Sequence, residues 1–470
     1  MGPQYRRRLI TPLFPPVPLF DGRATTERCP PRIISVIDGS ADRPSARCGS
    51  RLRSAADHFP CALHLLPVIA LCLLLAAGDV LAEVIPGTDL LARSGFGLLQ
   101  GKAVGLITNQ TGRSRDGTST IDLLATAPGL RLVALFSPEH GIRGDADVKL
   151  ASTTDQRTGL PIHSLYGASC RPTPAMLAGI DLLVFDIQDI GARFYTYIGT
   201  LHHALRAAKE RNIPLVVPDR PNPLGGVVVK GAVPDAAAVA RRIAADRTGC
   251  RSLAVTHPIP TRHGMTVAEL ARMINAEAGI NADLRIVPMA GWQRSMTWQD
   301  TGLAWINPSP NMKDPVAALL YPAFGPLEAT TLAVGRGTDR PFHQYGAPWL
   351  DPAAVLRNLP VLPGIRFSAT SFTPTAPGHP HRNKRCNGIG VAISEPEAAN
   401  LSVAALYLVQ AIYRAHPDQF KVAEGFHGMV GDREVWRLLT AEGMPPEQVA
   451  ARWGEGIEEF RKRRERFLLY

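Results

Sequence analysis

Four short apolar segments, each followed by polar residues, constrain the fold of this chain most strongly. They cover residues 103–107, 132–136, 182–187 and 214–217, and helical patterns such as residues 199–211 lie between them. Continuous apolar strands that alternate with helices are typical of a parallel sheet covered on both faces. The sequence therefore predicts an α/β domain with a doubly wound sheet.

The polar residues that follow these strands predict one ligand site. In chain order the candidates are Asn109 and Gln110, then Glu139 and His140, then Gln188, Asp189 and Arg193, and finally Asp219, Arg220 and Asn222. In open parallel sheets the ligand crevice lies beyond the carboxyl ends of the strands, so the four clusters should converge. Helix capping and turn formation explain Asn109 well. They explain the long ionisable side chains of Glu139 and Arg193 poorly.

The sequence after these strands predicts a helix over residues 264–278, with Thr266 as N-cap and Glu269 completing a capping box. A Pro-rich stretch at 307–311 follows. Beyond it we expect strands at 330–334 and 388–394, a helix at 399–415 and a charged helical tail from residue 450. We interpret residues 83–313 as the domain that carries the predicted ligand site, and 314–470 as a smaller α+β domain that completes its cleft.

Residues 1–82 look like a leader rather than a part of the fold. The segment 65–77 reads LLPVIALCLLLAA and precedes a small-residue cleavage site, Val80-Leu81-Ala82. This predicts a signal peptide over about residues 61–82, a mature chain that begins at Glu83, and a periplasmic or secreted location without a stable membrane anchor. The competing interpretation, a buried core helix, fits less well because the segment lacks an amphipathic period.

The mature chain has only a mild positive charge. The whole sequence holds 51 basic and 41 acidic residues, of which ten and six lie in the leader, so a net charge of +6 remains. This is compatible with an anionic substrate and too weak for nucleic-acid binding. Three widely spaced cysteines remain as well, namely Cys170, Cys250 and Cys386. They allow at most one disulfide and exclude a zinc finger.

Several enzyme classes lack their motifs in this sequence. We find no GxGxxG or GxxxxGK[ST] loop, no GxSxG elbow and no HExxH pair, so we expect neither cofactor nor metal. Carboxylates are abundant near strand ends instead, at Glu139, Asp186, Asp189, Asp219 and Glu328. Glycoside hydrolysis requires a carboxylic acid to protonate the leaving oxygen and a second carboxylate. The pattern fits a sugar site, in a glycosidase or in a sugar-binding protein.

Seven motifs make residues 85–470 resemble the exo-β-N-acetylmuramidase family NamZ. They are SPEHG (137–141), DIQDIGARFYTYIGT (186–200), DRPNPLGG (219–226), RHGMTVAEL (262–270), NPSPNM (307–312), LEAT (327–330) and GRGTDRPFHQYGAPW (335–349). The resemblance implies a Rossmann-like domain without nucleotide, a smaller C-terminal domain and a cleft between them. It also implies a bacterial glycoside hydrolase that releases N-acetylmuramic acid from the non-reducing ends of peptidoglycan fragments.

The same resemblance assigns the catalytic glutamate to Glu139. Its motif neighbours are His140, Asp186, Gln188, Asp189, Arg193, Tyr195, Asp219, Arg220, Asn222, His263, Asn311, Glu328 and Arg336. Apart from Asp186 and Asp189, we expect these residues to bind the substrate, together with Asn109 and Gln110. Two local departures are Ala329, where the family pattern has Gly, and the stretch 255–257 ahead of the RHGMT motif.

We expect Glu139 to be the general acid, with burial between the domains favouring its protonated form. Asp186 and Asp189 compete for the second catalytic role. One of Arg193, Arg220 and Arg336 is expected to pair with the lactyl carboxylate of N-acetylmuramic acid, because a planar guanidinium suits a carboxylate. For each arginine a structural salt bridge is an equal alternative. The alternative functions are a periplasmic murein-fragment binding protein without turnover and an amidase or deacetylase.

Overall fold

The computed structural model describes residues 83–142 and 152–470. These residues belong to one compact unit of the chain. The predicted leader, its signal peptide and its cleavage site lie outside the described residues and stay predictions. None of the helices in the described part is long and apolar enough to cross a membrane.

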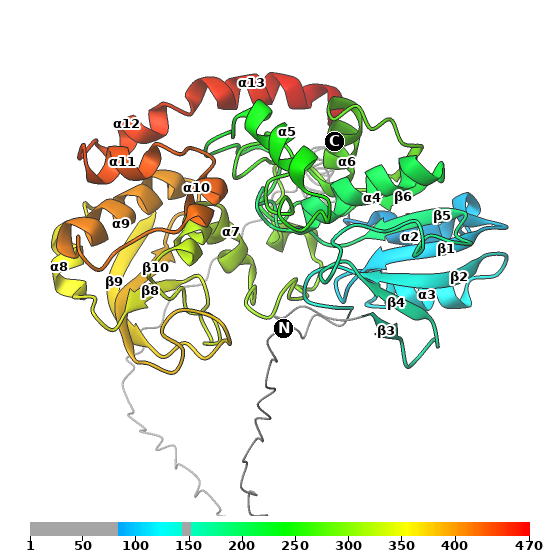
Figure 1. Ribbon diagram of the computed structural model, residues 1–470, viewed down its shortest axis with the longest axis horizontal. Coiled ribbons are helices and arrows are strands. Elements are labelled where there is room, and N and C mark those ends of the chain that lie inside the picture. Colours follow the sequence, from blue (N-terminus) through cyan, green and yellow to red (C-terminus); the bar gives the residue numbers. More distant parts are fainter. Residues whose placement is uncertain (1–82, 143–151) are drawn as a thin grey trace, which may run out of the picture. The chain divides into compact units, whose positions relative to one another are not determined.

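The larger sheet has seven strands in the order β3-β4-β2-β1-β5-β6-β7 (Figure 1). Their bounds are β1 Ala103–Thr108, β2 Arg131–Ser137, β3 Thr153–Thr154, β4 Pro161–Ser164, β5 Leu182–Asp186, β6 Leu215–Pro218 and β7 Leu284–Val287. All neighbours are parallel except β3 and β4. Numbered along the chain, the six parallel strands have the order 3-2-1-4-5-6, which is the Rossmann order. The predicted doubly wound, mostly parallel sheet is confirmed.

Helices cover both faces of this sheet, because successive strand residues point to opposite sides. On β5, Leu182 and Val184 belong to one apolar cluster, and Leu183 and Phe185 belong to another. The first cluster lies under α2 (Gly87–Arg93) and α3 (Thr120–Thr126), and the second under α4 (Tyr197–Arg211) and α6 (Val267–Glu277). Both halves of the predicted capping box of α6, at Thr266 and Glu269, are present.

A smaller antiparallel sheet follows, in the order β8-β10-β9, as the predicted α+β region requires. Its strands are β8 Gln344–Ala347, β9 Ile365–Phe372 and β10 Cys386–Ile393, and the helices beside it are α7 Pro315–Phe324, α8 Pro352–Arg357 and α9 Leu401–Ala415. The predicted strand at 330–334 is wrong. This segment forms only isolated bridges, Thr330 to Val422 and Ala333 to Gly346, since no partner continues alongside it.

The remaining helices are α5 Ala236–Ala245, α10 Glu424–Val430, α11 Val435–Thr440, α12 Pro446–Ala451 and α13 Gly454–Arg464, with short 3₁₀ turns η1 Gly97–Leu99, η2 Gln299–Thr301, η3 Gly325–Ala329 and η4 Glu465–Phe467. The end of the chain returns to the parallel-sheet part. Arg464 Nη1 donates to the carbonyl oxygens of Gly226 and Gly264, at 2.9 and 2.8 Å. The Tyr470 hydroxyl donates to Asp219 Oδ2 at 2.9 Å.

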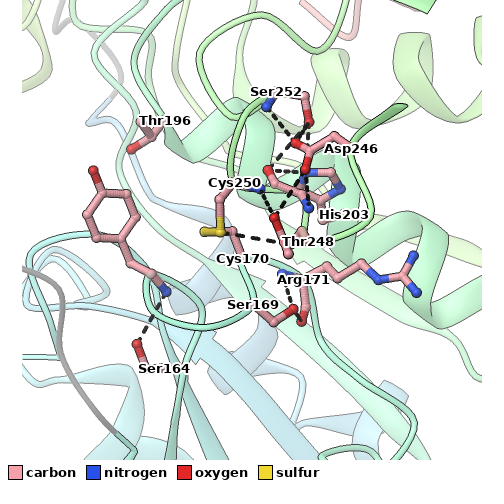
Figure 2. The surroundings of a disulfide bond; sticks show 12 residues. Ser164, Ser169, Cys170, Arg171, Thr196, His203, Asp246, Thr248, Cys250 and Ser252 are labelled. Atoms are coloured by element: carbon pink, nitrogen blue, oxygen red, sulfur yellow. Dashed lines mark hydrogen bonds between the residues drawn. A yellow bond between two sulfur atoms is a disulfide. The ribbon is translucent and has the colours of Figure 1, made fainter. Parts of the chain in front are cut away.

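One disulfide, between Cys170 and Cys250, joins the segment after β4 to the segment after α5 (Figure 2). The Cys170 amide also donates to the carbonyl oxygen of Thr248, at 2.8 Å. Cys386 is the free cysteine of the described residues, and it is buried. This pairing agrees with the prediction that the three cysteines form at most one disulfide.

Candidate active site

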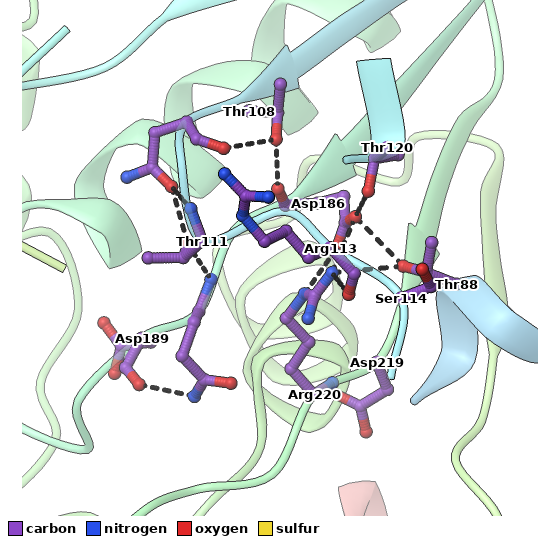
Figure 3. A network of polar contacts seen from close by, with 12 residues as sticks. Thr88, Thr108, Thr111, Arg113, Ser114, Thr120, Asp186, Asp189, Asp219 and Arg220 are labelled. Atoms are coloured by element: carbon purple, nitrogen blue, oxygen red, sulfur yellow. Dashed lines mark hydrogen bonds and ion pairs between the residues drawn. The ribbon is translucent and has the colours of Figure 1, made fainter. Parts of the chain in front are cut away.

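The crevice of the Rossmann order lies where β1 and β5 end side by side, with Thr108 opposite Asp186. Here the chain's own groups occupy that place (Figure 3). Arg220 donates from Nε to Asp186 Oδ1 at 2.5 Å and from Nη2 to Oδ2 at 2.8 Å. The hydroxyls of Thr88 and Thr120 donate to the same carboxylate, which is completely buried. Asp186 thus has the partner that a charge at the end of an apolar strand requires.

Asp189 lies just beyond, and its environment is different. Its Oδ2 accepts a hydrogen bond from the Gly191 amide at 2.8 Å, and Oδ1 is buried without a hydrogen bond in the described structure. Burial raises the pKa of Asp189 to about 7. The neighbouring ring of His263, 4.0 Å away, is neutral because burial lowers its pKa to about 3. His263 Nδ1 accepts from the Met265 amide, so Nε2 carries the proton and faces Asp189.

A cavity of about 320 Å³, which we call the Glu139 cavity, brings five of the predicted residues together. They are Glu139, His140, Tyr195, Glu328 and Arg336. Ligand pockets span about 300–1,000 Å³, so this volume suits a single sugar ring. Asp186 and Asp189 are not among its lining residues.

Glu139 is presented by the tight loop after β2. His140 (φ 71°) and Gly141 (φ 80°) are both left-handed, a conformation that costs free energy for a residue with a Cβ. Thr196 Oγ1 donates to Glu139 Oε2 at 2.6 Å. Thr196 is the N-cap residue of α4, so the carboxyl group lies beside the start of a 15-residue helix.

The Glu139 cavity contains a second carboxylate, on the 3₁₀ turn η3. Glu328 Oε1 accepts from Arg336 Nε at 2.6 Å, and Arg336 Nη2 contacts the same oxygen. The Tyr321 hydroxyl donates to Glu328 Oε2 at 3.2 Å. The Arg336 guanidinium lies over the ring of Phe342, 5.1 Å from its centroid. Both oxygens of Glu328 are therefore oriented by fixed donors.

Aromatic rings form much of the remaining wall. Tyr321 makes edge contacts with Phe342 and Tyr195, at centroid distances of 4.8 and 5.9 Å, and a tilted contact with Phe194 at 5.2 Å. Burial raises the pKa of Tyr195. Its ring also meets that of Tyr197 edge-on at 4.9 Å. Such rings can contact the apolar face of a sugar.

Other predicted residues near the strand ends stabilise the surrounding loops. Asn109 Nδ2 donates to the Tyr197 hydroxyl at 2.9 Å, and Gln110 Nε2 donates to the carbonyl oxygen of Asn307 at 2.7 Å. Gln188 Nε2 donates to the carbonyl oxygen of Pro221 at 2.7 Å. These three side chains thus connect the strand-end loops with one another and with the NPSPNM segment.

The side chains of the remaining predicted residues also make hydrogen bonds to other groups of the protein. Arg193 donates to the carbonyl oxygens of Gly428 and Met429, at 3.2 and 2.6 Å. Asp219 accepts from Thr266 and Ala268 at the start of α6. Asn222 Nδ2 donates to the Met265 carbonyl oxygen, and Asn311 Oδ1 accepts from the Gly337 amide at 2.8 Å. The structure does not bring Arg193 or Arg220 to the Glu139 cavity.

A larger hollow of about 580 Å³ lies beside α5, α10 and α13. Its two carboxylates serve the fold: Asp235 caps α5, and Asp432 accepts from Trp453 Nε1 at 3.1 Å. None of the seven quoted motifs contributes a residue to this hollow, so it is a weaker candidate for hydrolysis than the Glu139 cavity. No group of three or more metal-ligating side chains was found among residues 83–142 and 152–470.

Sequence reasoning missed several residues that line the Glu139 cavity. These are Tyr166, Phe194, Thr196, Ser309, Met312, Tyr321, Phe342, His379, Met429 and Ala254. Thr196 and Ser309 lie within quoted motifs, so their motif position was an available signal. Tyr321 lies on α7 and faces the cavity only because η3 folds back against that helix, which no local pattern indicates.

Comparison with known proteins decides the family. The model of the exo-beta-N-acetylmuramidase NamZ N-terminal region matches residues 104–316, and that of the C-terminal region matches residues 319–470. The chain belongs to the NamZ family. The predicted family is confirmed, and with it the prediction of a glycoside hydrolase. The chain is also 38% identical over 380 residues to the peptidoglycan beta-N-acetylmuramidase NamZ of Bacillus subtilis, which covers 79% of this chain and 88% of the relative.

Two solved structures from Bacteroides fragilis have the same fold. Both are described as proteins of a family of unknown function, DUF1343. The first is 34% identical with a TM-score of 0.72, and the second is 30% identical with a TM-score of 0.65. Each comparison covers 83% of this chain and 99% of the other. The fold of this NamZ chain thus recurs over nearly the whole length of both structures.

Proposed function

We propose that this chain is an exo-acting β-N-acetylmuramidase that releases N-acetylmuramic acid from the non-reducing ends of peptidoglycan fragments, with Glu139 as general acid. The observation that carries the proposal is the Glu139 carboxyl group on the wall of a cavity that suits one sugar ring. The name of the Bacillus subtilis relative supports the same reaction. Thr196 engages Glu139 Oε2, which leaves Oε1 for the leaving oxygen.

We assign recognition of the lactyl carboxylate to Arg336. Among the three predicted arginines it is the one that lines the Glu139 cavity. Arg220 is held by Asp186, and Arg193 by two backbone carbonyl groups. A planar guanidinium suits the geometry of a carboxylate. N-acetylglucosamine lacks the lactyl group, so the sugar without it should bind less well.

The proposal extends to where the enzyme works. The leader predicted over residues 1–82 supports export to the periplasm or the exterior, where peptidoglycan lies. We further propose that residues 83–313 supply the general acid and that residues 314–470 supply Glu328 and Arg336. The second domain thus completes the Glu139 cavity. N-terminal sequencing of the exported protein tests the leader, with Glu83 as the expected first residue.

The reaction is tested with two disaccharides of opposite order. N-acetylmuramic acid β-linked to N-acetylglucosamine should be cleaved into its two sugars, because its muramic residue is at the non-reducing end. The reversed disaccharide should remain intact. Binding of the first disaccharide without release of sugar over many hours would favour the murein-fragment binding protein over an enzyme.

A further inference from the structure

The hydrolysis of a glycoside needs a second group that accepts a proton while the acid gives one. The two aspartates predicted for this role are absent from the lining of the Glu139 cavity. Asp186 lies at the ends of β1 and β5 instead, where it pairs with Arg220. Asp189 is buried beside His263 instead. The carboxylate that does share the cavity with Glu139 is Glu328.

Glu328 differs from Glu139 in its hydrogen-bond donors. Glu328 pairs with the Arg336 guanidinium on Oε1 and accepts from the Tyr321 phenol on Oε2. Glu139 accepts from a neutral threonine hydroxyl on one oxygen. Glycoside hydrolysis uses two carboxyl groups, one as acid and one as base. This cavity holds two, and they differ in the donors that orient them.

The position of the Glu328 carboxylate is also fixed by its neighbours, as a group that contacts a reacting atom requires. Its side chain is 17% exposed and that of Arg336 is 13% exposed, so the pair meets the cavity at its edge without being fully solvated. Phe342 packs under the guanidinium, and the ring of Tyr321 packs on the same Phe342. These contacts fix both donors and therefore fix the carboxylate.

We propose that Glu328 is the general base of this reaction, which rests on the proposed function of the Glu139 cavity. A water oxygen forms a bond to C1 of the sugar while the bond from C1 to the glycosidic oxygen breaks. One proton of the water passes to Glu328, and the proton of Glu139 passes to the departing oxygen. The products are N-acetylmuramic acid and the shortened fragment. Glu328 then loses its proton to solvent, and Glu139 regains one.

If Glu328 is the base, Tyr321 and Arg336 position it in addition to contacting the substrate. Each orients one oxygen of Glu328, so both are positioning residues for the base. Removing the Tyr321 hydroxyl should lower kcat by about 10-fold, since one hydrogen bond to the carboxylate is lost while the carboxylate remains. Arg336 is harder to test alone, because it is also assigned to the substrate carboxylate.

The first test uses Glu328→Gln and Glu328→Ala with an aryl β-N-acetylmuraminide. Loss of a general base should lower kcat by about 100-fold or more in both variants. Glu455→Gln, on the exposed surface of α13, is the matched control and should keep the wild-type rate.

The second test distinguishes a base from a structural residue. Azide should restore turnover of Glu328→Ala and yield the α-glycosyl azide, because a small anion can occupy the space of the missing side chain and attack C1. NMR of the wild-type reaction should show the α-anomer first, since direct attack by water inverts a β-glycoside. Absence of the azide product in a folded variant, or a first product that is the β-anomer, overturns the proposal. If Glu328→Ala fails to fold, Glu328→Gln and the wild-type anomer still decide it.

These outcomes separate the two proposals. If wild type releases N-acetylmuramic acid and Glu328→Gln does so equally well, Glu328 is not the base and the function of the cavity stands. If wild type releases no sugar from either disaccharide, the proposed function itself fails.

Discussion

Replacing Asp186 by Asn should destabilise the protein while sparing its chemistry. The carboxylate is completely buried and accepts hydrogen bonds from Arg220, Thr88 and Thr120. An asparagine keeps one acceptor oxygen and directs an NH₂ group at the guanidinium, which leaves Arg220 as a buried cation without a counter-charge. Breaking a buried ion pair in this way costs about 3–5 kcal/mol.

The expected change in melting temperature follows from the size of the folded unit. Unfolding entropy of about 2.1 cal/mol/K per residue, over roughly 390 residues, gives about 0.8 kcal/mol/K. A loss of about 3–5 kcal/mol should therefore lower Tm by about 4–6 °C. Differential scanning calorimetry at neutral pH measures this shift. Asp283→Asn, which removes an exposed carboxylate paired with Arg285, is the control and should change Tm by less than about 1 °C.

The activity of the folded variant completes this test. Because Asp186 lies outside the Glu139 cavity, the kcat/KM of Asp186→Asn below its Tm should stay within about 10-fold of wild type, whereas loss of a catalytic carboxylate costs about 100-fold or more. An unchanged Tm together with a large loss of kcat would refute the reasoning and return Asp186 to the second catalytic role.

Three further predictions concern pH, the disulfide and substrate choice. Asp189 has a folded pKa of about 7, above its unfolded value of 3.8, so the folded state binds more protons between these values, and this group's stabilising effect is lost as pH rises from about 4 to 7. Neutral His263 acts in the opposite direction, because its folded pKa of about 3 is depressed, so the Asp189→Asn variant must be compared with wild type at each pH. The Tm of Asp189→Asn relative to that of wild type should rise between pH 5 and 8. A Tm difference that stays constant would contradict the raised pKa of Asp189. Replacing Cys170 and Cys250 by Ser opens a loop of 80 residues and should lower the free energy of unfolding by about 2–4 kcal/mol, measured by calorimetry against the oxidised wild type. Arg336→Lys should reduce the preference for N-acetylmuramic over N-acetylglucosamine glycosides by at least about 10-fold, because the fork geometry is lost, and an unchanged kcat/KM ratio would show that other groups hold the lactyl carboxylate.

The larger sheet could be predicted because its strands are continuous apolar segments. Strands buried on both faces need apolar side chains at every position, and β1 and β5 show this directly. The strands β3 and β4 could not be predicted in the same way. Both residues of β3 are exposed, and β4 begins with a proline, so neither carries an apolar signal. Their pairing depends on β2, because β4 pairs with β2 and β3 pairs with β4.

The site could be predicted only as a set of residue types near strand ends. Sequence indicated that Asp186 and Arg220 lie near one another, but it did not show that they would pair and fill the crevice of the Rossmann order. The directions of long side chains depend on tertiary packing. For the same reason, Glu328 was predicted to bind substrate, and its pairing with Arg336 and Tyr321 became visible only in the fold.

The most direct measurement of the central claim compares wild type with Glu139→Gln on two substrates. One is the disaccharide of N-acetylmuramic acid and N-acetylglucosamine, whose leaving oxygen needs a proton. The other is an aryl glycoside with an acidic phenol, whose leaving oxygen needs little help. We predict that Glu139→Gln binds both substrates and keeps its fold, loses about 100-fold or more in kcat on the disaccharide, and loses far less on the aryl glycoside. Equal losses on both substrates, or full activity of the variant on the disaccharide, would contradict the assignment of Glu139 as the acid of this cavity.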